Sequence, residues 1–259
     1  MANTLSSYTD KEFTEGLGSI AKKLLLPPSI CPRKEPQAVL LGGQSGAGKT
    51  TLHKLLAQNM QGGVVVINGD EYRSYHPRYR ELDAAYGADA VAHTAAWAGK
   101  MTEALIDEFS IAGFNLIIEG TLRTSEVPMK TATLLRKRGY SVSLALMAVK
   151  PEISLISCQI RYELMRITGT IPRATDPAHH NKIVRDIVNN VDVLEQSELF
   201  DEVHLYTRKG TCLYPASEKN KTASMVLQKT LFGPWTSDEK EHYAFLQEKL
   251  AALRTQGTP

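Results

Sequence analysis

The sequence predicts an α/β fold in which a central, mostly parallel sheet is flanked by helices, and three observations support this. Strand-like and helix-like stretches alternate through the middle of the chain, a glycine-rich turn joins the first strand to a helix, and the end of the chain is helical in pattern. Alternation of this kind favours parallel strands joined by right-handed crossovers, with helices on both faces. We expect a P-loop kinase-like three-layer fold with a helical C-terminal extension, in which the glycine-rich turn is the phosphate loop.

Local patterns predict the individual elements. Thr9 and Glu12 have capping-box spacing, so a helix should begin there and end at Pro27 and Pro28. Short runs of apolar residues predict five strands: 38–43, 64–69, 114–120, 140–149 and 202–210, and "TCLYP" could extend the last one. Helical periodicity predicts helices over 50–60, 89–113, 127–139, 151–167, 179–197 and 224–233. A second capping box at Thr236 and Glu239 predicts a final helix.

Composition sets broad limits on the protein class. The 259 residues are 42% hydrophobic and 22% charged, with a net charge of +2, so we expect a soluble protein that binds neither nucleic acid nor membrane. The three cysteines are far apart, and the N-terminus lacks a signal-peptide pattern, which together favour the cytoplasm. We expect one P-loop kinase domain, with an N-terminal helix and connector at 1–34, a core at 35–215 and C-terminal helices at 216–259.

The stretch GQSGAGKT, Gly43 to Thr50, matches the full G-x-x-x-x-G-K-[ST] pattern between a predicted strand and a predicted helix. Backbone N–H groups in such a loop converge on phosphate oxygens. Lys49 should reach the β- and γ-phosphates, and Thr50 should hold Mg²⁺. The sequence therefore predicts a nucleoside triphosphate with Mg²⁺. The expected nucleotide-binding residues are Gly43, Gln44, Ser45, Gly46, Ala47, Gly48, Lys49, Thr50 and Thr51.

The loop leaves the phosphate acceptor open: water, a protein or a small hydroxyl compound. The D-x-x-G and N-K-x-D patterns of a GTPase are absent, because Asn181-Lys182 and Asn220-Lys221 both lack the aspartate. This favours a hydroxyl acceptor over water. Such a kinase needs a carboxylate near the hydroxyl and cations to stabilise charge on the transferring phosphoryl group.

Two acids, Asp70 and Glu119, follow predicted parallel strands, and ligands of open α/β sheets bind at the edge where such strands end. Asp70 could instead bind the metal or cap a helix over "EYRSYH", and Glu119 could be a solvated loop acid. Arg161 and Arg173 flank a segment containing glycine and proline, as expected of a lid that closes over phosphates, although surface arginines would look the same.

Several further stretches carry a resemblance: "LLGGQSGAGKTT", "INGDEYRSYHP", "AGKMTEALI", "LIIEGTLRT", "IRYE" and "RAT…HH". Together, over nearly the whole chain, they resemble the zeta toxins of bacterial toxin–antitoxin systems. The resemblance implies a kinase that transfers the ATP γ-phosphate to the 3′-hydroxyl of the amino sugar of UDP-N-acetylglucosamine, which inhibits cell-wall synthesis. It also implies a cognate antitoxin whose helix covers the ATP site.

The same resemblance implies specific roles. Asp70 would be the base that takes the hydroxyl proton, with Arg73 as a supporting neighbour, and Arg161 and Arg173 would clamp the ATP phosphates. The implied substrate-pocket residues are Asp70, Glu103, Glu119, Thr121, Arg123 and Thr131. Asn181 departs from the family's pattern, which has aspartate after the paired histidines. Two alternatives stay open: a P-loop kinase for another acceptor (a nucleoside, an antibiotic or a nicotinamide dinucleotide), and a non-catalytic nucleotide-dependent binding protein.

Overall fold

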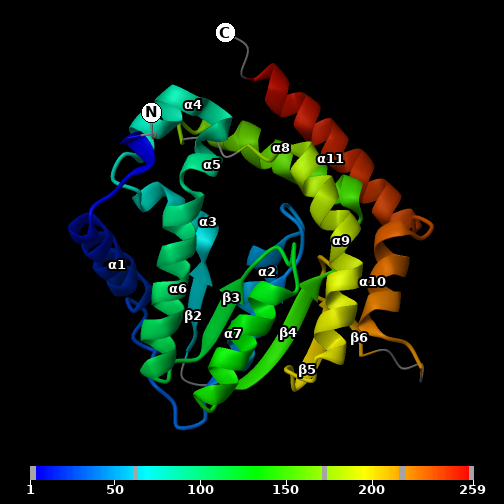
Figure 1. Ribbon diagram of the computed structural model, residues 1–259. Helices are drawn as coiled ribbons and strands as arrows, with labels where there is room; N and C mark the ends of the chain where they lie inside the picture. The colour runs from blue at the N-terminus through cyan, green and yellow to red at the C-terminus, as the bar shows by residue number, and fades with distance from the viewer. Residues whose placement is uncertain (1–3, 61–62, 171–173, 216–219, 257–259) are drawn as a thin grey trace.

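A computed structural model describes residues 4–60, 63–170, 174–215 and 220–256. Within these residues the sheet has six strands in the order β2-β3-β1-β4-β5-β6 (Figure 1). The strands are β1 Gln37–Gly42, β2 Val65–Asn68, β3 Leu116–Glu119, β4 Ser141–Met147, β5 Glu202–Tyr206 and β6 Cys212–Tyr214. All pairs are parallel except β5 with β6. The predicted fold class is confirmed.

Two apolar clusters, one on each face of the sheet, attach the helices. One includes Leu40 and Leu144 and receives α1 Asp10–Leu24, α6 Ala95–Ile111, α7 Glu126–Lys137, α9 Pro177–Gln196 and α10 Ala223–Phe232. The other includes Leu41 and Ala145 and receives α2 Lys49–Asn59, α8 Pro151–Ile167 and α11 Ser237–Thr255. Neighbouring strand residues point to opposite faces, which is why Leu40 and Leu41 belong to different clusters.

Short helices complete the chain: η1 Thr4–Ser6, α3 Gly69–Tyr72, η2 Arg73–Tyr75, α4 Tyr79–Tyr86, η3 Gly87–Asp89 and α5 Ala90–His93. Both predicted capping boxes are present, at Thr9 with Glu12 and at Thr236 with Glu239. None of the helices formed by the described residues has both the length and the apolar character needed to cross a bilayer.

The helix predicted over 89–113 is wrong as a single element, because it divides at Thr94 into α5 and α6. The Thr94 hydroxyl donates to Ala90 O (3.0 Å), a bond within the preceding turn. Arg73 donates to Val91 O (2.7 Å) and to Thr94 Oγ1 (3.3 Å). The backbone carbonyl of Val91 therefore has a side-chain partner at the break, which a periodicity argument does not detect.

The stretch "TCLYP" does not extend the fifth strand but contributes a separate, antiparallel edge strand, β6. The chain reverses between them: Thr207 N donates to Thr211 O (2.9 Å) and Gly210 N donates to Thr207 O (3.0 Å). Gly210 has φ +81°, a conformation that glycine adopts at little cost. The turn therefore sets the position of Arg208, which matters below.

Candidate active site

The phosphate loop follows β1 directly, and its glycines have the backbone that the motif requires. Gly43, Gly46 and Gly48 have φ values of +136°, +77° and +99°. A Cβ atom on Gly46 would lie 2.0 Å from Ser154 O of α8. Both the positive φ and the lack of room for a Cβ atom therefore require glycine at position 46. The loop lies directly against α8.

Lys49 begins α2 and its side chain turns back into the loop. Lys49 Nζ donates to Gly43 O (2.7 Å) and Gln44 O (3.3 Å) and lies 3.7 Å from Glu119 Oε1. The residue is 8% exposed. Burial lowers the pKa of Lys49, while the negative charges of Glu119 and Asp70 act in the opposite direction. The cation is thus held at the loop, on the backbone oxygens that surround it.

Glu119 ends β3, and the strand register places it beside Leu41 of β1 and Asn68 of β2. Its Oε2 atom lies 2.8 Å from His53 Nε2 of α2, although these two atoms are not aligned for a hydrogen bond. The sequence analysis missed His53. Its signal was available, since His53 is four residues after Lys49 and the two side chains therefore share one helix face.

Asp70 lies in α3, just after β2, and its side chain is 57% exposed. Arg73 Nε donates to Asp70 Oδ1 (3.1 Å), while Arg73 Nη1 donates to Val91 O and Thr94 Oγ1 at the α5–α6 break. The alternative that Asp70 caps its helix is wrong. Asn68 is the N-cap, and its Oδ1 accepts from Asp70 N (3.1 Å).

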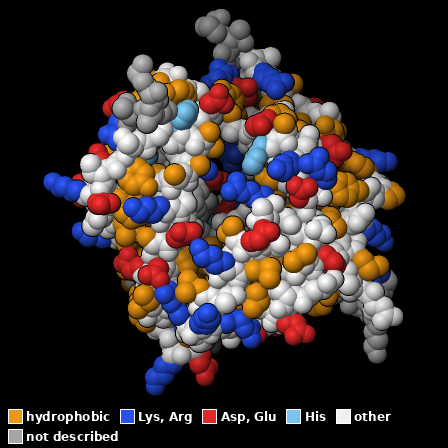
Figure 2. Space-filling model, in the orientation of Figure 1, with side chains coloured by type: hydrophobic (Ala, Val, Ile, Leu, Met, Phe, Trp, Pro, Cys, Tyr) orange, Lys and Arg blue, Asp and Glu red, His pale blue; other side chains and the backbone are white. Residues whose placement is uncertain are grey.

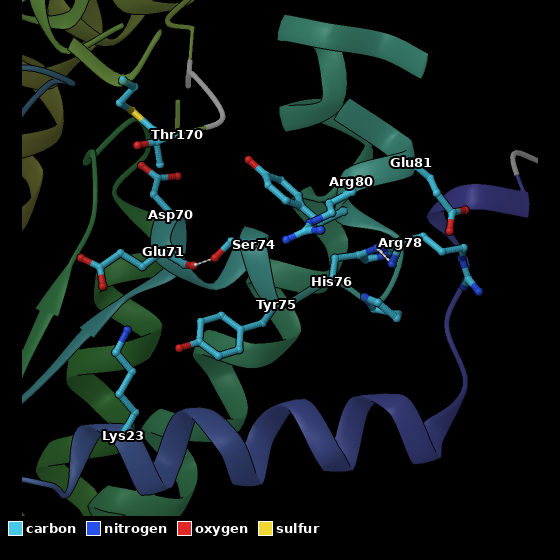
Figure 3. A pocket seen from close by; sticks show the side chains of 13 residues that line it. Lys23, Asp70, Glu71, Ser74, Tyr75, His76, Arg78, Arg80, Glu81 and Thr170 are labelled. Carbon is cyan, nitrogen blue, oxygen red and sulfur yellow. Dashed lines mark hydrogen bonds between the residues drawn. The ribbon is translucent and has the colours of Figure 1, made fainter. Parts of the chain in front are cut away.

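A cavity of about 670 Å³ opens beside Asp70. Figure 3 shows Asp70 next to Thr170 at one side of it, with Tyr75 and, from α1, Lys23 farther along the wall. Figure 2 shows a hollow on the face seen in Figure 1, with acidic and basic side chains around its opening. The Asp70 carboxylate is therefore accessible to a small molecule.

Of the two arginines predicted to clamp the ATP phosphates, the structure describes only one. Arg161 lies on α8 with an exposed side chain, and its Nη2 donates to Thr175 Oγ1 (3.4 Å), just before α9. Arg173 lies outside the described residues. Arg161 is thus tied to the connection between α8 and α9, which is where the sequence predicted a lid.

The remaining predicted pocket residues lie on α6, α7 and the segment after β3. Glu103 is 77% exposed, with Oε1 4.0 Å from Lys130 Nζ, and Thr131 Oγ1 donates to Val127 O (3.1 Å). Thr121 is half-buried and Arg123 is exposed. The structure thus brings Lys49 and Glu119 together. The contacts described for Glu103 and Thr131 are with Lys130 and Val127 of α7, and not with Lys49 or Glu119.

Between Thr121 and Arg123, Leu122 has φ +52°, an unusual backbone for a bulky residue. Asn190 of α9 is buried and its Nδ2 donates to Leu122 O (2.9 Å). The Leu122 side chain covers Gly42, where a Cβ atom would lie 2.2 Å from it. Asn190 therefore stabilises the turn that carries Thr121 and Arg123, and sequence reasoning missed it.

A buried polar chain connects the phosphate loop to α9. Gln44 Nε2 donates to Val149 O (2.8 Å) and Ser154 Oγ (3.2 Å), and Ser154 Oγ lies 2.9 Å from His180 Nε2. Burial lowers the pKa of His180. Separately, Trp97 of α6 is buried and its Nε1 donates to Tyr72 O of α3 (2.9 Å), which attaches α3 to α6.

The phosphate loop after β1 and the acids that follow β2 and β3 at the same sheet edge define a P-loop protein of kinase-like fold. A family model described as Zeta toxin matches residues 26–219. The chain belongs to the zeta toxin family.

Three comparisons describe the similarity. The chain is 45% identical to Toxin PezT of Streptococcus pneumoniae serotype 4, over 96% of this chain and 98% of that protein. It is 34% identical to Toxin zeta of Streptococcus pyogenes, over 100% of this chain and 90% of the relative. A solved structure from the PezAT chromosomal toxin–antitoxin system of S. pneumoniae aligns with a TM-score of 0.86 at 43% identity, covering 97% of this chain and 99% of that one.

A more distant structure shows the fold alone. The AvrRxo1-ORF1:-ORF2 complex with ATP aligns at a TM-score of 0.53 and 14% identity, covering 94% of this chain and 86% of that chain.

Proposed function

We propose that this protein is a kinase that transfers the γ-phosphate of ATP to the 3′-hydroxyl of the amino sugar of UDP-N-acetylglucosamine and thereby inhibits cell-wall synthesis. The observation that carries the kinase assignment is that buried Lys49 lies 3.7 Å from Glu119 at the end of β3, beside the end of β2, after which Asp70 follows in α3. Family membership supports the choice of acceptor.

The donor side fits ATP. Left-handed glycines shape the loop, and Lys49 Nζ already lies on backbone oxygens of Gly43 and Gln44. A polyphosphate would offer Lys49 charged oxygens in place of neutral ones, which strengthens its hydrogen bonds. Thr50 follows Lys49 in the first turn of α2, and Lys49 Nζ lies 3.7 Å from Glu119 Oε1. The Thr50 hydroxyl and the Glu119 carboxylate are oxygen ligands of the kind that Mg²⁺ takes, and the ion would neutralise phosphate charge when bound.

On the acceptor side, Asp70 takes the proton from the sugar hydroxyl as the new O–P bond forms and the bond between the γ-phosphorus and the ADP oxygen breaks. Arg73 Nε donates to Asp70 Oδ1 and so orients the carboxylate. Arg161 and, from the sequence pattern, Arg173 stabilise charge on the phosphoryl group. Glu103, Glu119, Thr121, Arg123 and Thr131 complete the proposed pocket.

The proposed partner is an antitoxin protein that lays a helix over the nucleotide site. The similarity to a toxin from the PezAT toxin–antitoxin system supports this proposal, since that similarity extends over nearly the whole chain.

The test mixes the purified protein with ATP, Mg²⁺ and UDP-N-acetylglucosamine and follows the sugar nucleotide by mass spectrometry. We expect a product heavier by one phosphate. Asp70→Asn should lower kcat about 10²–10⁴-fold and keep ATP binding, whereas Asp89→Asn, a matched change of an exposed acid, should keep turnover. If ATP is consumed without a sugar product, the acceptor assignment is wrong. Full turnover by Asp70→Asn would overturn the base assignment.

A further inference from the structure

Arg208, in the turn between β5 and β6, contacts the phosphate loop. Its Nε donates to Ala47 O (3.2 Å), and its Nη2 donates to Gly46 O and to Ser157 Oγ (2.8 Å). A Cβ atom on Gly48 would lie 3.6 Å from Arg208 Cγ and Nε, so the stem also packs along the loop. Arg208 is separated from these loop residues by about 160 positions in the sequence.

The backbone that carries Arg208 is itself constrained. In addition to the two backbone bonds of the turn, Thr211 N donates to Thr207 Oγ1 (3.2 Å). On its outer side, Arg208 Nη1 lies 3.4 Å from His242 Nε2 of α11. Burial lowers the pKa of Arg208. Hydrogen bonds from the guanidinium to Ala47 O and Ser157 Oγ replace those that it would make with water. The guanidinium is therefore a fixed group between the loop, α8 and α11.

This arrangement has a consequence for the loop's N–H groups. In a trans peptide the C=O and N–H bonds point in opposite directions. A carbonyl of Ala47 held by Arg208 therefore turns the N–H of Gly48 away from Arg208. In a phosphate loop such N–H groups bind the ligand's oxygens. The same guanidinium holds Ser157, which is one helical turn before Arg161 on α8.

We propose that Arg208 is a positioning residue that fixes the Ala47–Gly48 peptide so that its N–H faces the bound polyphosphate, and that it couples the phosphate loop to the helix that carries Arg161. The inference rests on the proposed binding of ATP at this loop. It requires Arg208 to act on the polyphosphate part of the ligand through the backbone, with no dependence on the base.

The experiment measures binding of ATP, GTP and inorganic tripolyphosphate, each with Mg²⁺, by isothermal titration calorimetry. Arg208→Ala should weaken all three by a similar factor, about 10–100-fold, the range for groups that orient binding residues without touching the ligand. Arg208→Lys should recover part of the affinity, because lysine keeps the charge but not the fork. The KM for the sugar nucleotide should change less than the KM for ATP.

Lys209→Ala is the matched control. Lys209 is the next residue and also binds α11, through Asp238 (2.7 Å), but it has no described contact with the phosphate loop. We expect it to bind all three ligands like the wild type. Equal weakening by Lys209→Ala would mean that attachment of α11 is what matters, and would overturn the proposal.

The remaining outcomes are also decisive. If Arg208→Ala weakens the binding of ATP but not of GTP or tripolyphosphate, Arg208 acts on the adenine base and the inference is contradicted. Unchanged binding of all three ligands would also contradict it. If Arg208→Ala does not fold, Ser157→Ala removes one anchor of the guanidinium and should weaken the three ligands in parallel but less. Failure of the wild type to bind ATP would instead overturn the proposed function.

Discussion

The donor and acceptor sides of the site differ in how completely the protein holds them. On the donor side, Lys49 is 8% exposed and bonded to the loop, and Gly46 has no room for a Cβ atom. On the acceptor side, Asp70 is 57% exposed and Glu103 is 77% exposed. Groups fixed before the reaction stabilise developing charge most effectively. The proposed phosphate site is therefore prebuilt, whereas two carboxylates of the proposed acceptor site are mostly exposed to solvent.

The largest expected effect is on the stability of the donor side. Gly46→Ala places a methyl group on Ser154 O, and a left-handed alanine adds strain. Strain of about 1–3 kcal/mol adds to an overpacking penalty of similar size. We therefore expect a large decrease in the free energy of unfolding, measured by urea denaturation. Gly18→Ala in α1 has open space at its Cβ and should instead increase stability by about 0.5–1 kcal/mol. Equal stability of the two variants would contradict a prebuilt loop.

Lys49→Met should remove catalysis and also destabilise the protein. It takes the cation away from Glu119 and the donor away from Gly43 O and Gln44 O, so a mostly buried carboxylate loses its partner and the melting temperature should decrease. Loss of one preorganised cation should lower kcat about 10²–10³-fold. Expression of the wild type without antitoxin should stop bacterial growth, and the variant should not. Growth arrest by Lys49→Met would show that toxicity does not need phosphoryl transfer.

Asn190→Leu probes the boundary between the two sides. It removes the donor to Leu122 O and leaves a buried carbonyl without its partner, which should cost about 1–3 kcal/mol in unfolding free energy. The turn carrying Thr121 and Arg123 should loosen, so the KM for the sugar nucleotide should increase more than the KM for ATP. Asn189→Leu, on the exposed side of the same helix, is the control. An increase confined to the KM for ATP would contradict the placement of this turn on the acceptor side.

The smallest expected effect is on pH dependence. Burial lowers the pKa of His180, so the unfolded chain binds this proton more readily than the folded protein. The contribution is fully favourable above the ordinary pKa of about 6.5, and stability declines as the pH decreases from there to the lowered pKa. The decline amounts to about 1.4 kcal/mol for each unit by which the pKa is lowered. Denaturation at several pH values should show a shallower decline for His180→Gln. An identical slope would assign the effect to His76 and His242, whose pKa values burial also lowers.

Sequence reasoning succeeded where the determining interactions are local. The capping boxes at Thr9 and Thr236 are contained within four residues, and the phosphate loop is contained within eight. It failed where a partner comes from elsewhere. The break at Thr94 involves Arg73, which is 21 residues earlier in the chain.

Local patterns in the chain were enough to predict the five parallel strands, most of the long helices, the phosphate loop and the two acids at the strand ends, because periodicity, glycine placement and capping are properties of neighbouring residues. Packing of the elements against one another brings His53 to Glu119, Asn190 to Leu122 and Arg208 to the phosphate loop. Each of these contacts joins elements that meet only when the sheet and its two helix layers pack. No local pattern encodes a hydrogen bond between residues that are far apart in the chain.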